Sequence, residues 1–212
     1  MGKTNLLYVF FLVLDEADRM LDLGFEPSVR AICAQIPAER QTVMFSATWP
    51  ETVQALAAKF QRDVIRIHVG STSLHANRDV KQNFVFVRHD GMKMQELRKI
   101  MRRYQDKRIL IFALYKKSVN FLESQLGREY GAIAIHSDKS QQHREAMLER
   151  FKSTQGSILI ATDVAARGLD VKELEVVINY EFPLQIDDYV HRIGRTARAG
   201  AKGDAFTLLS DG

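Results

Sequence analysis

Short apolar runs alternate along the chain with segments in which apolar residues recur every three or four positions. The first pattern is typical of buried strands and the second of amphipathic helices. In the first third of the chain this alternation predicts strands within 10–18, 41–48 and 63–70 and helices at 28–36 and 50–60.

Residues 70–79 are polar and have no hydrophobic period, so we interpret them as a linker. Beyond this linker the alternation of strand and helix patterns resumes. The predicted strands lie at 83–88, 108–114, 132–136, 157–163, 175–181 and 205–210. The predicted helices lie at 94–104, 117–126, 141–151 and 187–195.

Regular alternation of strands and helices predicts an α/β protein in which a parallel sheet carries helices on both faces. Ligand sites in such sheets lie beyond the carboxyl ends of the strands. Polar clusters follow three predicted strands at this edge: Asp15 with Glu16, Ser46 with Thr48, and Thr162 with Asp163.

The composition is that of a globular protein, and 212 residues suit one large domain or two small ones. The single cysteine, Cys33, excludes an internal disulfide and a Cys-based zinc site, and its helical spacing predicts a core position. No apolar run is long enough to span a membrane, and no signal-peptide pattern is present. We therefore expect a nuclear, nucleolar or cytoplasmic protein that is not secreted. A net charge of +4 permits a polyanionic partner.

Gly2-Lys3-Thr4 matches the end of a phosphate-binding P-loop. A working P-loop is G-x4-G-K-[ST] between a strand and a helix, where backbone N–H groups cradle phosphate. Only Met1 precedes Gly2, and residues 5–14 run directly into the next predicted strand, which leaves no room for the helix. We interpret Gly2 to Thr4 as a surface turn.

Asp15 and Glu16 end an apolar strand, which is the Walker-B arrangement. One carboxylate of such a pair holds Mg²⁺, directly or through water, and the other positions or deprotonates the attacking water. Taken alone, these acids fit a solvated helix start equally well, because acids are favoured in first helical turns.

Residues 191–198 carry several basic side chains. Arg195 and Arg198 are three positions apart and share a face if the segment is helical. Two guanidinium groups that converge on one point suit a γ-phosphate. The alternative, a basic surface helix that binds nothing in particular, leaves the distant acidic and Ser/Thr clusters unexplained.

In this order the segments resemble the motifs of the DEAD-box ATP-dependent RNA helicases of superfamily 2, and the resemblance covers nearly the whole chain. The matching segments are 13–27 for motif II, 46–48 for motif III, 109–112 for motif IV, 141–144 for Q-x-x-R, 161–170 for motif V and 191–198 for motif VI. Residues 2–6, 46–51 and 111–117 look like the sub-branch that contains p68-like and pre-ribosomal helicases.

The resemblance implies two RecA-like domains. Residues 80–212 would form a complete second domain, and residues 1–69 the C-terminal part of the first, ATP-binding domain. The family's Q motif and P-loop, which precede motif II, are missing from these 212 residues. We therefore expect a truncated chain that is not catalytically competent alone.

The resemblance also implies ATP and Mg²⁺ as cofactors, with roles in the first domain for four residues. Asp15 and Glu16 would handle Mg²⁺ and the attacking water. Ser46 and Thr48 would couple hydrolysis to domain closure through hydrogen bonds with the acids of motif II.

In the second domain the resemblance implies nucleotide contacts from motifs V and VI. Arg195 and Arg198 would contact the γ-phosphate, and Asp170 the ribose. His191 would link motif VI to motifs II and III.

RNA is the partner that the resemblance implies, bound through its backbone without sequence preference. The implied RNA-binding residues are Gln141, Arg144, Thr162, Arg167 and Gly168. Ribonucleoprotein or pre-ribosomal partners and a monomeric state are further expectations, and a membrane partner is not expected.

Two functions remain open. The first is an ATP-dependent RNA helicase that couples ATP hydrolysis to local duplex unwinding. The second is a non-catalytic RecA-like module that binds RNA or protein. A third, a carboxylate-metal hydrolase built on Asp15, Glu16 and Asp18, leaves motifs V and VI unexplained.

Overall fold

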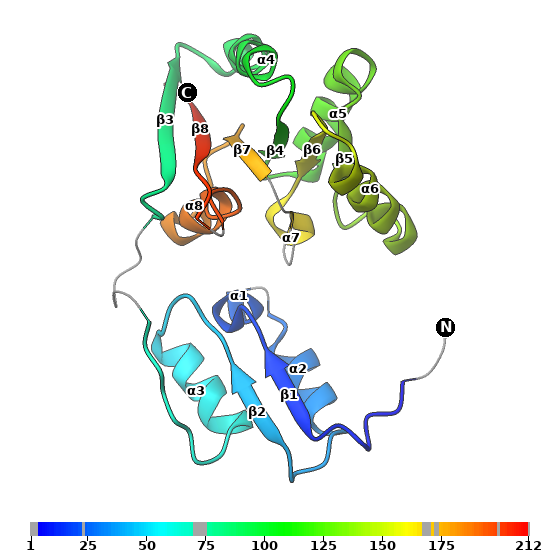
Figure 1. Ribbon diagram of the computed structural model, residues 1–212, viewed down its shortest axis with the longest axis vertical. Coiled ribbons are helices and arrows are strands. Elements are labelled where there is room, and N and C mark those ends of the chain that lie inside the picture. The colour runs from blue at the N-terminus through cyan, green and yellow to red at the C-terminus, as the bar shows by residue number, and fades with distance from the viewer. Residues whose placement is uncertain are drawn as a thin grey trace. The chain divides into compact units, whose positions relative to one another are not determined.

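The computed structural model divides into two compact units, residues 1–74 and 75–212 (Figure 1). The structure describes residues 4–22, 24–69, 76–166, 171, 174–198 and 200–211. The division lies inside the predicted linker 70–79, of which residues 70–75 are outside the described part.

The first unit holds a two-stranded parallel sheet with Phe11 opposite Gln41 and Leu14 opposite Met44. Its elements are β1 (Phe11–Leu14), α1 (Ala17–Asp22), α2 (Glu26–Cys33), β2 (Gln41–Met44) and α3 (Glu51–Phe60).

The core of the first unit is small and consists of two clusters. The buried members are Leu14, Val29 and Cys33 in one cluster and Ala17, Val53 and Leu56 in the other. The predicted core position of Cys33 is confirmed, and burial raises the pKa of its thiol. Several large apolar side chains remain exposed: Tyr8, Phe10, Phe11, Phe45, Ile65 and Ile67.

The predicted strand at 63–70 is wrong over its described residues, because the structure has no strand at 61–69. A strand exists only where a neighbouring strand accepts and donates its ladder hydrogen bonds. A groove of about 480 Å³ is lined both by residues of β2 and by residues 61–65 and Ile67. Ile65 and Ile67 are 86% and 82% exposed.

The second unit contains a six-stranded sheet in the order β3-β8-β7-β4-β6-β5, in which all neighbouring pairs are parallel. Its elements are β3 (Val80–Val87), the 3-10 helix η1 (Asp90–Met92), α4 (Lys93–Arg103), β4 (Arg108–Phe112), α5 (Lys116–Tyr130), β5 (Ile133–Ile135), α6 (Gln141–Ser153), β6 (Ile158–Ala161), α7 (Asp163–Ala166), β7 (Leu174–Asn179), α8 (Ile186–Ile193) and β8 (Gly203–Ser210). The predicted parallel α/β architecture is confirmed.

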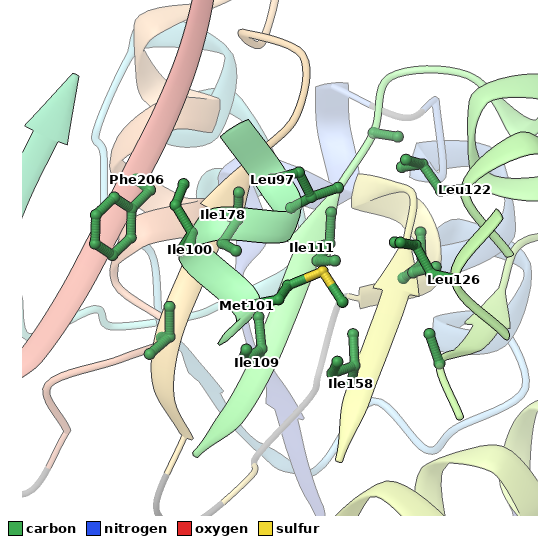
Figure 2. Packing of buried hydrophobic residues seen from close by; sticks show 14 of the residues in the cluster. Leu97, Ile100, Met101, Ile109, Ile111, Leu122, Leu126, Ile158, Ile178 and Phe206 are labelled. Carbon is green, nitrogen blue, oxygen red and sulfur yellow. The ribbon is translucent and has the colours of Figure 1, made fainter. Parts of the chain in front are cut away.

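Helices cover both faces of this sheet, as predicted. On one face, α4 and α5 pack on Ile109 and Ile111 of β4 (Figure 2). On the other face, α6 and α7 pack around Leu110 and Phe112, and α8 packs on Ala205 of β8. Because successive strand residues point to opposite faces, a continuous apolar run such as β4 is buried on both.

Among the described residues, no helix combines the length and apolar composition that crossing a bilayer requires.

The two units should differ in resistance to proteolysis. The first has a small core, exposed apolar side chains and the extended stretch 61–69, so it should open more readily. We expect limited proteolysis of the 212-residue chain to cut within residues 1–69 before the second unit, and to leave a soluble fragment that contains residues 80–211. Mass spectrometry of a digestion time course measures this, and survival of residues 1–69 after loss of the second unit would contradict it.

Candidate nucleotide and nucleic-acid sites

Asp15 and Glu16 lie directly beyond the carboxyl end of β1. The Asp15 Oδ1 atom accepts a hydrogen bond from the Glu16 N–H at 2.9 Å. Glu16 has φ of 52°, in the left-handed region, which costs a non-glycine residue about 1–3 kcal/mol. The next residue, Ala17, donates its N–H to the Phe45 carbonyl at the end of β2. These hydrogen bonds therefore hold the two acids in a sharp turn between β1 and α1.

Ser46 and Thr48 are tied to the third acid of this segment, Asp18. The Thr48 N–H and hydroxyl both donate to Asp18 Oδ2 at 2.9 Å. Ser46 Oγ accepts from the Asp18 N–H at 3.2 Å and donates to the Thr48 carbonyl at 2.7 Å. Asp18 is 5% exposed, and its Oδ1 accepts from the Arg19 N–H. These bonds join the residues predicted as motifs II and III.

Asp18 was not among the residues assigned to the ATP site from the sequence, but its hydrogen bonds connect the segment of Asp15 and Glu16 to the segment of Ser46 and Thr48. The available signal was its position three residues after Asp15, at the start of a helix, where a buried acid needs donors from another segment. The resemblance implied hydrogen bonds from Ser46 and Thr48 to the acids of motif II, and the structure shows that the acid concerned is Asp18.

Asp15 and Glu16 fit a magnesium ion of the kind that keeps most of its waters. Mg²⁺ prefers hard oxygen ligands and commonly takes one or two carboxylates together with phosphate oxygens. Asp15 is exposed and Glu16 partly exposed, so both are accessible, whereas Asp18 is buried in its own hydrogen bonds. Among the described residues no group of three or more His, Cys, Asp or Glu side chains could hold a metal.

In the second unit a buried arginine joins the segments predicted as motifs V and VI. Arg192 of α8 is 1% exposed. Its Nε and Nη2 atoms donate to the two carboxylate oxygens of Asp163, each at 2.7 Å. This bidentate geometry is the strongest arrangement that an arginine and a carboxylate form.

The remaining surface of the Arg192 guanidinium is also satisfied. Its Nη1 donates to the Glu181 carbonyl at 2.8 Å and to Asn179 Oδ1 at 3.3 Å. Asn179 donates in turn to Thr207 Oγ1. The guanidinium carbon lies 5.1 Å from the ring centre of Phe112. One side chain therefore links α8 to the carboxyl ends of β4, β6 and β7.

The predicted helix at 187–195 ends early, at Ile193, so the condition under which Arg195 and Arg198 would share a helical face is not met. α8 ends at Ile193, and the chain then makes tight turns in which the Arg195 N–H bonds to the Arg192 carbonyl. Ala197 has φ of 56°, which a helix cannot accommodate.

Tertiary packing fixes this turn beside the amino ends of β7 and β8. Thr196 Oγ1 donates to the Leu174 carbonyl at 2.6 Å, and Thr196 is 1% exposed. A Cβ atom on Gly203 would lie 2.0 Å from Thr196 Oγ1, so only glycine fits there. Arg195 and Arg198 flank this anchored residue, and His191 lies one residue before Arg192 in α8.

The predicted RNA-contacting residues that the structure describes lie beyond β5 and β6. Gln141 and Arg144 are in the first turn of α6, and Arg144 Nη2 donates to Gln141 Oε1 at 2.6 Å. Thr162 follows β6, is 8% exposed, and accepts from the Ala165 and Ala166 N–H groups through its carbonyl. Because β5 and β6 are neighbours, these segments share one edge of the sheet.

Arg167, Gly168 and Asp170, predicted to contact RNA and ribose, lie outside the described residues.

A buried histidine, His136, to which the sequence assigns no role, lies in the segment between β5 and α6. It is 3% exposed, with Nε2 2.9 Å from Asn120 Oδ1, while Nδ1 accepts from the Asp138 N–H at 3.3 Å. A ring that donates through one nitrogen and accepts through the other is neutral. Burial lowers the pKa of His136 below 6.5, and the nearby Lys139 charge lowers it further.

Comparison with known proteins gives these motifs a family. The profile described as DEAD/DEAH box helicase matches residues 2–56, and the profile described as helicase conserved C-terminal domain matches residues 92–200. The second match alone covers about half of the chain. The chain belongs to the DEAD-box helicase family.

Curated relatives agree with this assignment. The chain is 57% identical over 209 residues to "Putative DEAD-box RNA helicase HEL64" of Trypanosoma brucei brucei, covering 98% of this chain and 37% of that protein. It is 49% identical over 214 residues to "ATP-dependent RNA helicase DBP2" of Eremothecium gossypii, covering 99% of this chain and 38% of that protein. The chain thus spans little more than a third of these relatives.

Solved structures support the RecA-like fold. The structure of S. cerevisiae Dbp5 bound to RNA and ADP BeF3 matches with a TM-score of 0.87 and 29% identity, covering 98% of this chain and 55% of that one. The structure of Mss116p bound to ssRNA and AMP-PNP matches with a TM-score of 0.79 and 27% identity, covering 97% of this chain and 44% of that one.

The Arg192–Asp163 pair should be essential for stability. We expect Arg192→Met to lower the free energy of unfolding by about 3 kcal/mol, because it leaves Asp163 without its buried partner. Arg102→Met, which removes an exposed arginine from α4, is the matched control and should change stability by less than about 0.5 kcal/mol. Urea denaturation measures both, and equal midpoints for the two variants would refute the assigned role.

Stability should fall as the solution becomes acidic, partly through His136. Its pKa is below 6.5 in the folded protein, so the unfolded chain binds more protons as the pH falls through 6.5 and below. His136 therefore does not destabilise the folded protein above pH 6.5, and the free energy of unfolding falls as the pH drops below 6.5. The difference between the denaturation midpoints measured above and below pH 6.5 should therefore be smaller in His136→Gln than in the wild type. His89→Gln, which changes an exposed histidine, is the control and should show the same difference as the wild type.

Proposed function

We propose that the chain is part of an ATP-dependent RNA helicase, in which ATP hydrolysis drives local unwinding of RNA duplexes. The observation that carries this proposal is the bonding of Asp18 to Ser46 and Thr48, with Asp15 and Glu16 exposed at the same strand end. A movement of Asp15 or Glu16 would be transmitted to residues 46–48 through the hydrogen bonds of Asp18. An enzyme that couples ATP hydrolysis to a conformational change requires such a connection between its nucleotide-binding residues and a second segment.

Each acid has a proposed role in this reaction. Asp15 holds Mg²⁺, which when bound neutralises charge on the phosphate oxygens. Glu16 accepts the proton of the attacking water or orients that water. Asp18 keeps its carboxylate on Thr48 and so fixes the position of the segment that carries the two acids.

The second unit supplies the arginines and an RNA surface in this proposal. Arg195 and Arg198 contact the γ-phosphate, and the anchored Thr196 keeps them at the end of α8. Gln141, Arg144 and Thr162 line the RNA side beyond β5 and β6. The Dbp5 and Mss116p structures were solved with RNA and nucleotide, which supports both ligands for this chain.

We further propose that these 212 residues do not hydrolyse ATP by themselves, because they contain no complete G-x4-G-K-[ST] sequence. Phosphate release from ATP should stay at the background level, with or without RNA. The Glu16→Gln variant is the control for contaminating activity. RNA-stimulated release that disappears in Glu16→Gln would show that the chain turns over without that motif.

A module that binds RNA without turnover is the second candidate for the 212 residues alone, favoured by the basic side chains beyond β5. We expect weak binding to single-stranded RNA, independent of sequence and weakened by salt, because phosphate contacts release counterions. Fluorescence anisotropy over a salt series measures this. Arg144→Ser should weaken binding and the control Arg102→Ser should not. Equal effects of the two variants, or strong preference for one sequence, would contradict the assigned surface.

A further inference from the structure

A cavity of about 330 Å³ opens in the second unit, and its lining residues are not among the proposed ATP or RNA residues. Its walls include the aromatic side chains of Phe121 on α5 and Tyr180 after β7. Its charged lining groups are Asp90, Lys93, Lys117 and Glu181. This volume is at the lower end of the range of about 300–1,000 Å³ that small-ligand sites occupy. It therefore suits a single ring better than a whole nucleotide.

The cavity lies where the topology of a parallel sheet favours a binding site. β4 and β7 are neighbours, and the chain leaves β4 through α5 on one face and β7 through α8 on the other. A crevice forms between the carboxyl ends of two such strands, and ligands of open α/β sheets bind there. Phe121 comes from the helix after β4 and Tyr180 from the loop after β7, so the cavity occupies this crevice.

A phosphate is excluded from this crevice because a carboxylate already occupies the place that it would take. Glu181 Oε2 accepts from the Leu114 N–H at 2.7 Å, and Oε1 accepts from Ser118 Oγ at 2.8 Å. These donors lie at the start of α5, where the helix dipole and the unpaired N–H groups favour an anion. The protein's own Glu181 satisfies them.

The other acid of the cavity is also neutralised internally. Lys93 Nζ lies 2.9 Å from Asp90 Oδ1, and its side chain is only 10% exposed. Ser210 Oγ donates to the same oxygen at 2.6 Å. Lys117 differs, because within the described part of the chain it forms no ion pair, and its Nζ lies 5.4 Å from the ring centre of Tyr115. The cavity thus presents two aromatic walls and one cation that no carboxylate neutralises.

We propose that this cavity binds an aromatic side chain of a partner protein, next to a carboxylate of the same peptide that pairs with Lys117. The ring packs between Phe121 and Tyr180, and its neighbouring acid gives the orientation. A nucleotide is disfavoured, because Glu181 already occupies the Leu114 N–H and the Ser118 hydroxyl that would otherwise bind its phosphate. The cavity is lined by none of the proposed ATP or RNA residues. If the proposed helicase function holds, the cavity is a site at which the helicase binds a protein partner.

The test uses the isotopically labelled 212-residue chain and the blocked dipeptide acetyl-Phe-Glu-amide in amide NMR titrations. We expect saturable shifts concentrated at Leu114, Ser118, Phe121, Tyr180 and Glu181. Acetyl-Ala-Glu-amide, which lacks the ring, and acetyl-Phe-Lys-amide, which reverses the charge, should bind at least about fivefold more weakly, a difference of about 1 kcal/mol.

Two variants separate the ring contact from the charge contact. Phe121→Ser should weaken binding of acetyl-Phe-Glu-amide about tenfold, as loss of an aromatic anchor does. Its control is Phe86→Ser, which removes a phenylalanine that is 74% exposed and lies on β3 outside the cavity. Lys117→Glu should invert the preference, so that acetyl-Phe-Lys-amide binds more tightly than acetyl-Phe-Glu-amide.

Three outcomes would overturn the proposal. The first is shifts that scatter over the surface or that persist unchanged in Phe121→Ser. The second is an unchanged preference in Lys117→Glu. The third is a single-stranded RNA oligonucleotide that shifts the same five amides and displaces the dipeptide, which would assign the cavity to RNA. None of these outcomes depends on ATP turnover, so the proposed helicase function is tested separately.

Discussion

The buried guanidinium of Arg192 is the constraint on which the site of the second unit depends. A charge removed from water is tolerated only when every donor finds an acceptor. Arg192 meets this demand with Asp163 after β6 and with Asn179 and the Glu181 carbonyl after β7. The hydrogen bonds of the Arg192 guanidinium therefore fix the end of α8 against the ends of β6 and β7. The turn that carries Arg195 begins directly after this fixed end.

The first unit applies the same physics with the opposite charge. Asp18 is buried and takes its donors from Thr48 and from the Arg19 backbone. In both units a buried ionised group joins two segments that are distant in sequence, and the exposed reactive groups lie beside it. The buried group gives the geometry, and the exposed groups, such as Asp15, remain accessible to ligands.

The sequence predicted the sheet of the second unit chiefly through strands such as β4 and β6, which are largely apolar and buried on both faces. It failed at 63–69, where apolar and polar residues alternate but the described residues form no strand, since strand formation is decided by a neighbouring strand and not by composition. It failed again at the end of α8, because Ala197 adopts a positive φ under packing by Thr196 and Gly203. For the candidate site, motif order implied that Ser46 and Thr48 bond to the acids of motif II, but only the structure identifies Asp18 as the acid that Thr48 contacts.

Glu181 shows how a parallel sheet can keep a binding crevice and still reject phosphate. The start of α5 has the N–H groups and the dipole that attract anions, and Glu181 occupies them with a carboxylate from the neighbouring loop. The same residue uses its carbonyl to accept from Arg192. The residue that closes this crevice to phosphate therefore also helps to hold α8, so a substitution that opened the crevice by moving the Glu181 backbone would also disturb Arg192.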